Sequence, residues 1–124
     1  KAVIQTITMT EQRYAQARDS VDFIKRYIFP GGCLPSLAVI SDTLARVTDM
    51  QTTNLRDITH DYAKTLSIWQ SCFVDRLDAV SELGFDDKFT RMWQYYLSYC
   101  EGGFRERIIG TYQITLAKPG YRPG

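Results

Sequence analysis

Two stretches of this 124-residue chain show clear strand patterns, and a third shows a weak one. Residues 2–8, Ala-Val-Ile-Gln-Thr-Ile-Thr, form a β-branched run that predicts a buried strand. Residues 108–118 alternate between apolar and polar side chains, which predicts a last strand. One face of that strand carries Tyr112, Ile114 and Leu116. A weaker pattern near residues 46–53 predicts another strand between these two.

Helical spacing predicts two long helices between the last two strands. The first runs from Thr59 to Ser81, because apolar residues recur there at steps of three and four. These residues are Tyr62, Leu66, Trp69, Phe73, Leu77 and Val80. The second begins after a cap at Asp86 or Asp87 and ends at Gly102-Gly103. Its apolar stripe consists of Phe89, Met92, Trp93, Tyr96, Leu97 and Cys100.

Two shorter helices are expected earlier in the chain. One begins near Asp19 or Ser20 and is stopped by the Pro-Gly-Gly sequence at residues 30–32. The other opens at Pro35-Ser36 and presents an apolar face. Residues 9–19 are polar and predict a loop or a weak helix.

The order of these elements predicts a helix-rich α/β fold with about three strands and four helices. Three strands alone cannot cover the helices on both sides, and the chain opens directly on a strand expected to be buried. We therefore expect residues 1–118 to be the C-terminal part of a larger α/β domain, and residues 119–124 to form a tail.

Composition narrows the classes of function. Fifteen basic and fourteen acidic residues leave a net charge of +1, which argues against a strongly cationic nucleic-acid-binding protein. The three cysteines have no CxxC spacing, so neither a zinc site nor a secreted disulfide scaffold is predicted, and free thiols in the cytoplasm fit best. No apolar run reaches the roughly 18 residues needed to cross a bilayer, so any membrane contact is expected to be peripheral.

Three segments resemble the cyclopropane-fatty-acyl-phospholipid synthase family, which includes the mycolic acid cyclopropane synthases. They are YIFPGGCLPS at residues 27–36, HDYAKTL at residues 60–66, and the stretch from RMWQYYL at residue 91 through Phe104-Arg105. The resemblance implies a class I methyltransferase that depends on S-adenosylmethionine. In this view the three predicted strands are the fifth, the sixth and the antiparallel seventh of its sheet. The cofactor site would lie upstream, and no GxGxG turn occurs in this chain.

The resemblance also implies a reaction. An alkene in an unsaturated phospholipid acyl chain attacks the sulfonium methyl group, and a bound bicarbonate takes a proton from the resulting cation to close a cyclopropane ring. Matched position by position, Tyr62 and the backbone of Ile7 are bicarbonate ligands, and Cys100 lies close to the active site. The histidine position of the family falls on Gln5, whose amide can donate a hydrogen bond but carries no titratable proton. The side chains of Tyr62, Cys100 and Gln5, with the Ile7 backbone, form the candidate site.

Other interpretations stay open. Spacing alone makes Tyr62 and Cys100 core residues, and Gln5 in a strand needs a hydrogen-bond partner wherever it is buried. The product could be a methyl-branched chain, or the substrate could be something other than a lipid. In isolation the chain is expected to be inactive, and it could instead act as a helical module that forms a homodimer through the edge of its first strand or by helix swapping. With a lipid substrate, the protein is expected at the inner surface of the cytoplasmic membrane.

Overall fold

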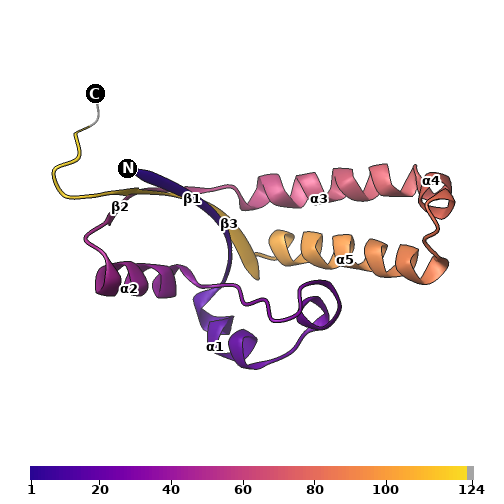
Figure 1. The fold of residues 1–124 in the computed structure, drawn as a ribbon, viewed down its shortest axis with the longest axis horizontal. Helices are drawn as coiled ribbons and strands as arrows, with labels where there is room; N and C mark the ends of the chain where they lie inside the picture. The colour runs from indigo at the N-terminus through magenta and orange to yellow at the C-terminus, as the bar shows by residue number, and fades with distance from the viewer. Residues whose placement is uncertain (123–124) are drawn as a thin grey trace.

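The computed structural model describes residues 1–122, which form a three-stranded sheet with helices at its side and end (Figure 1). The strands are β1 (Ala2–Met9), β2 (Gln51–Asp57) and β3 (Ile109–Ala117). The α-helices are α1 (Glu11–Asp19), α2 (Leu37–Val47), α3 (Thr59–Val74), α4 (Leu77–Glu82) and α5 (Asp87–Arg105), with a π-helical turn at Ile24–Ile28. Of the predicted tail, residues 123–124 lie outside the described residues.

The sheet places the last strand in the middle. β3 lies between β1 and β2 and is antiparallel to both, so β1 and β2 run in the same direction without pairing. In this register Gln113 of β3 lies opposite Gln5 of β1 on one side and opposite Arg56 of β2 on the other. Residues directly opposite each other present their side chains to the same face of a sheet. Gln5, Gln113 and Arg56 therefore lie on the same face of the sheet, one on each strand.

Two strand predictions need correction. The middle strand in sequence, β2, lies at Gln51–Asp57 rather than near residues 46–53, because α2 continues through Val47 and Thr48 ends it. Every residue of β2 is exposed, so the strand has no hydrophobic alternation for a pattern to reveal. β1 was expected to be buried, but Val3 and Ile4 are exposed, since only the second half of the strand is covered by helices.

The helix boundaries also differ in part from the predictions. The helix expected over residues 59–81 is broken after Val74 and resumes as α4, and no glycine or proline marks the break. The Asp86 cap is confirmed, since its carboxylate accepts a hydrogen bond of 2.8 Å from the Phe89 N–H. The prediction that α5 ends at Gly102-Gly103 is wrong, because the helix continues to Arg105. A Cβ on Gly103 would come within 3.2 Å of Ile109, so this glycine permits close packing against β3.

The N-terminal helices are confirmed only in part. Residues 11–19, expected to be a loop or a weak helix, form α1, and the helix expected after Ser20 is reduced to the π-helical turn. The helix opening at Ser36 is confirmed, because the Ser36 hydroxyl caps α2 by accepting from the Val39 N–H at 3.2 Å.

The apolar core lies where α3 and α5, which run antiparallel, meet the sheet (Figure 1). Its buried members are Ala63, Leu66, Leu97 and Phe104. From the sheet, Ile7 and Ile109 pack against this cluster, which shows that α3 and α5 cover one face of β1 and β3. The opposite face of β3 carries Ile114 and Leu116, which share a face as predicted and are buried. Trp69, expected on the buried stripe of α3, is exposed.

Candidate functional site

Gln5 and Tyr62 come together at the edge of this core although they are far apart in the sequence. The Gln5 Nε2 donates a hydrogen bond to the Tyr62 hydroxyl oxygen at 3.0 Å. Gln5 lies in the middle of β1, and Tyr62 lies in the first turn of α3, just after β2 ends. The amide of the opening strand and the phenol of the long helix, which the resemblance assigned to one site, therefore lie within hydrogen-bonding distance, and their roles as anion ligands stay predictions.

Gln113 joins the same network, although it was not among the candidate site residues. Its Nε2 donates to the Gln5 Oε1 at 3.0 Å, from the position directly opposite on β3. Two amides and one phenol thus form a continuous hydrogen-bonded row. Only the strand register brings Gln5 and Gln113 together, so no local sequence signal could have indicated this partner.

Ile7 lies two residues after Gln5 on the same face of β1, beside the row formed by Gln113, Gln5 and Tyr62. Its side chain packs against the buried cluster, as does that of Tyr62, whose ring lies 5.3 Å from the Phe104 ring between centroids. The Ile7 carbonyl oxygen accepts a hydrogen bond from the Thr6 hydroxyl at 3.1 Å. Opposite Ile7, Thr111 is fully buried, and its hydroxyl has no hydrogen-bond partner among residues 1–122. The region therefore combines an apolar cluster with the polar groups of Gln5 and Tyr62 at its edge.

Cys100 lies in the apolar part of this region. Its side chain packs against the same core cluster from α5, and no hydrogen bond within the described part of the chain links it to Gln5 or Tyr62. Burial, and then the negative charge of Asp22, raises the pKa of the Cys100 thiol to about 11. The thiol is therefore protonated near neutral pH. Cys100 thus contributes to the apolar surface of this region and does not act as a nucleophile.

The start of α3, and with it the position of Tyr62, is fixed by hydrogen bonds to the end of β2 and to β3. The Asp57 carboxylate accepts from the Thr59 N–H at 2.9 Å and forms an ion pair with Arg107. The Thr59 hydroxyl in turn accepts from the Thr111 N–H at 3.1 Å. Arg107 is the one described non-glycine residue with a positive φ, 52°. Because α5 ends just before it, this conformation turns the chain from α5 into β3.

The ionisation of Asp57 predicts how this anchor depends on pH. Partial burial alone would raise its pKa, but hydrogen bonds from Thr59 and Arg107 outweigh burial and lower the pKa from 3.8 to about 2. A carboxyl whose folded pKa is lowered stabilises the fold fully above its unfolded pKa and loses that contribution as the pH falls through the folded value. We therefore expect Asp57→Asn to lower the melting temperature near neutral pH, by a difference from wild type that shrinks between about pH 4 and pH 2. Thermal melting across this range measures it, and a difference independent of pH would contradict the role given to the charge.

Arg105, the last residue of α5, is also paired. Arg105 contacts Glu101 at 2.7 Å, one helical turn away, and Arg107 contacts Asp57.

The three cysteines are free thiols. Residues 1–122 contain no group of three or more His, Cys, Asp or Glu side chains placed to hold a metal ion. None of the described helices is both long enough and apolar enough to cross a membrane.

The arrangement of strands and helices is that of the C-terminal part of a class I methyltransferase. The family model described as mycolic acid cyclopropane synthetase matches residues 1–114, and the chain belongs to this family of S-adenosylmethionine-dependent methyltransferases. The resemblance seen in the sequence is thereby confirmed.

Curated relatives and solved structures agree with this assignment. The chain is 41% identical to tuberculostearic acid methyltransferase UfaA1 of Mycobacterium tuberculosis over 117 residues, which are 94% of this chain and 27% of that protein. It is 32% identical to the cyclopropane-fatty-acyl-phospholipid synthase of Escherichia coli K12 over 96 residues, 77% of this chain and 24% of that protein. The structure of mycolic acid cyclopropane synthase CmaA1 complexed with SAH and CTAB matches with a TM-score of 0.81 and 25% identity. That match covers 94% of this chain and 43% of CmaA1. The chain thus spans about a quarter of the length of these curated relatives.

Proposed function

We propose that this chain is the C-terminal part of an S-adenosylmethionine-dependent methyltransferase that adds a methylene group to the double bond of an unsaturated phospholipid acyl chain. The product would be a cyclopropane fatty acid. The observation that carries the proposal is the hydrogen-bonded contact of Gln5 with Tyr62 at the edge of the apolar core. This contact combines the two features that the reaction needs, which are donors for an anion and an apolar surface beside them.

The polar groups of the site fit a small anion such as bicarbonate. The Tyr62 oxygen accepts from Gln5, so its own hydrogen is left to donate, and the Gln5 amide has a second N–H beyond the one given to Tyr62. Tyr62, Gln5 and the Ile7 backbone would hold the anion. Bound bicarbonate would supply a base for the proton lost on ring closure. This chain contains no glycine-rich nucleotide turn, so S-adenosylmethionine would be held by residues outside it.

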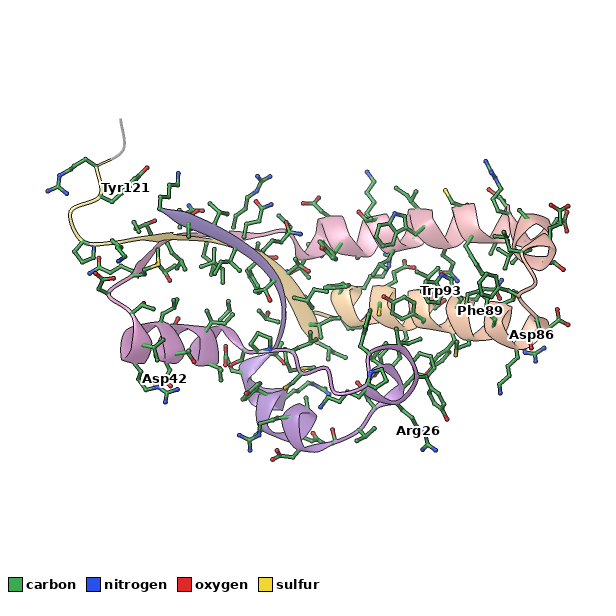
Figure 2. All side chains as sticks on the ribbon, in the orientation of Figure 1. Arg26, Asp42, Asp86, Phe89, Trp93 and Tyr121 are labelled. Atoms are coloured by element: carbon green, nitrogen blue, oxygen red, sulfur yellow. The ribbon has the colours of Figure 1, made fainter. Side chains whose placement is uncertain are left out.

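The apolar side of the site fits a lipid chain. Aromatic rings follow one another from just before α5 along that helix, with centroid distances of 4.3 Å from Phe85 to Phe89, 5.7 Å from Phe89 to Trp93, and 5.0 Å from Trp93 to Tyr96. Figure 2 shows Phe89 and Trp93 along this helix. We propose that this aromatic row contacts the acyl chain and helps to exclude water from the cationic reaction. Because such a substrate lies in a bilayer, the protein would work at the inner surface of the cytoplasmic membrane.

A second candidate is methyl transfer to a fatty acyl chain without ring closure, in which the cation loses a proton from a neighbouring chain carbon and leaves a methyl-branched alkene. Gln5 favours it, because an amide cannot exchange a proton with the anion as an imidazole can. Among the relatives, UfaA1 is named a tuberculostearic acid methyltransferase, and a Pseudomonas putida protein of 32% identity is named a probable fatty acid methyltransferase. A methyl-branched product is therefore the alternative outcome of the same assay.

The test uses the complete methyltransferase, meaning a protein that carries these 124 residues together with the cofactor-binding strands of the family. It is incubated with vesicles of a phospholipid that has a cis-monounsaturated acyl chain and with methyl-labelled S-adenosylmethionine. We expect label in the acyl chain and cyclopropane protons in the NMR spectrum of the lipid. A methyl-branch signal would select the alternative, and an unlabelled lipid would refute both. Residues 1–124 alone are expected to transfer no label.

A further inference from the structure

Gln113, Gln5 and Tyr62 form one hydrogen-bonded row that begins on the middle strand and ends on α3. The two links are both 3.0 Å long, from the Gln113 Nε2 to the Gln5 Oε1 and from the Gln5 Nε2 to the Tyr62 hydroxyl oxygen. The row is open at the Tyr62 end, where the phenolic hydrogen has not been used. It lies beside Ile7, which is the third element of the candidate anion site.

The direction of the hydrogen bonds decides what Tyr62 can do. Because the Gln5 oxygen accepts from Gln113, the Gln5 amino group must face Tyr62, and the phenol oxygen is the acceptor. The single hydrogen of the phenol is then free to donate to a ligand. If the row ran in the opposite direction, Tyr62 would donate to the Gln5 oxygen and would have no hydrogen left for an anion. The orientation of the Gln5 amide therefore decides whether the Tyr62 hydroxyl is free to donate to an anion or already donates to Gln5.

The far end of the row supports this direction. Arg56 of β2 lies directly opposite Gln113 and on the same face of the sheet. A guanidinium group can only donate hydrogen bonds, so its proximity favours a Gln113 amide whose oxygen faces Arg56 and whose amino group faces Gln5. Hydrogen bonds linked in one direction also polarise one another, which makes the last hydrogen a better donor.

We propose that Gln113 is a positioning residue for the anion site. It fixes the orientation of the Gln5 amide, and through Gln5 it directs the Tyr62 hydroxyl hydrogen toward the bound anion. This inference rests on the proposed function and adds to it the residue that sets the polarity of the site. A purely structural role explains the row poorly, because Gln5 is exposed and Gln113 is only half-buried. Hydrogen bonds between side chains in such places contribute little to net stability.

A double-mutant cycle in the complete methyltransferase tests the proposal. Gln5→Met, Gln113→Met and the double variant are compared with wild type for the dissociation constant of isotope-labelled bicarbonate, followed by NMR, and for kcat with phospholipid vesicles. We expect Gln113→Met to weaken bicarbonate binding and lower kcat by about tenfold, with the KM for S-adenosylmethionine unchanged. If Gln113 acts through Gln5, the double variant loses no more than Gln5→Met alone.

Gln70→Met is the matched control. Gln70 is half-buried like Gln113 and also links two elements, through a hydrogen bond of 2.8 Å to Ser98 on α5, but it lies outside the row. We expect Gln70→Met to bind bicarbonate as wild type does. If Gln113→Met does not fold, Arg56→Met, at the exposed position opposite Gln113 on β2, replaces it, with a smaller loss of bicarbonate affinity expected.

The outcomes separate this inference from the proposed function. Wild-type protein that labels lipid and binds bicarbonate, with Gln113→Met equal to Gln70→Met, would overturn the positioning role alone. So would losses that multiply in the double variant, because they would show that Gln113 acts independently of Gln5. Wild-type protein that neither binds bicarbonate nor labels lipid would overturn both proposals.

Discussion

Replacing Tyr62 by phenylalanine in the complete methyltransferase is expected to lower kcat by about a hundredfold while the fold is kept. The change removes only the hydroxyl, and the ring can retain its contact with Phe104 at 5.3 Å between centroids. What is lost is the hydrogen that the Gln113–Gln5 row leaves free, and losing one preorganised donor in an enzyme site typically costs roughly 10²–10³ in kcat. Label transfer to lipid vesicles measures kcat, and NMR of labelled bicarbonate measures binding of the anion.

Tyr14→Phe is the control for this experiment. Tyr14 is half-buried like Tyr62, but it lies on α1 and takes no part in the row of Gln113, Gln5 and Tyr62. The same removal of a hydroxyl there should leave kcat and bicarbonate affinity unchanged. Near wild-type activity for Tyr62→Phe would remove the phenol from the site. A loss of kcat with unchanged bicarbonate affinity would mean that Tyr62 acts on something other than the anion.

The regular elements of this fold could be predicted wherever burial leaves a periodic pattern. β3 is covered on both faces and was located within one residue at each end, and the start of α5 was marked by the Asp86 cap. β2 was misplaced because none of its residues is buried. The break between α3 and α4 at Asp75–Arg76 carries no glycine or proline, so the apolar spacing continued through it without interruption.

The candidate site could be predicted in part, and for a reason that differs from residue to residue. The resemblance placed Gln5 and Tyr62 together, and the structure shows their hydrogen bond, although their roles in catalysis stay predictions. Cys100 was placed near the site, and the structure adds that its thiol is neutral and lies in the apolar wall. Gln113 was missed because its importance depends on the register of two strands that are 108 positions apart at this contact.

Phe104→Ala is expected to cause the largest loss of stability, about 3–5 kcal/mol in the free energy of unfolding. Phe104 is only 2% exposed and belongs to the buried cluster at which α3, α5 and β1 meet. Its removal would leave a cavity beneath Tyr62, and the surrounding side chains can relax into such a cavity only in part. Urea unfolding of the complete methyltransferase, followed by tryptophan fluorescence, measures the change.

Phe85→Ala separates the effect of burial from that of aromatic content. Phe85 stacks on Phe89 at 4.3 Å but is 46% exposed just before α5, so its truncation should cost much less than that of Phe104. Phe104→Leu should recover most of the stability because it refills most of the cavity. If it also recovers kcat, the ring contributes volume alone. If stability returns and kcat does not, the tilted contact between Phe104 and Tyr62 is itself needed to hold the phenol in place. Equal destabilisation by Phe104→Ala and Phe85→Ala would contradict the location of the core.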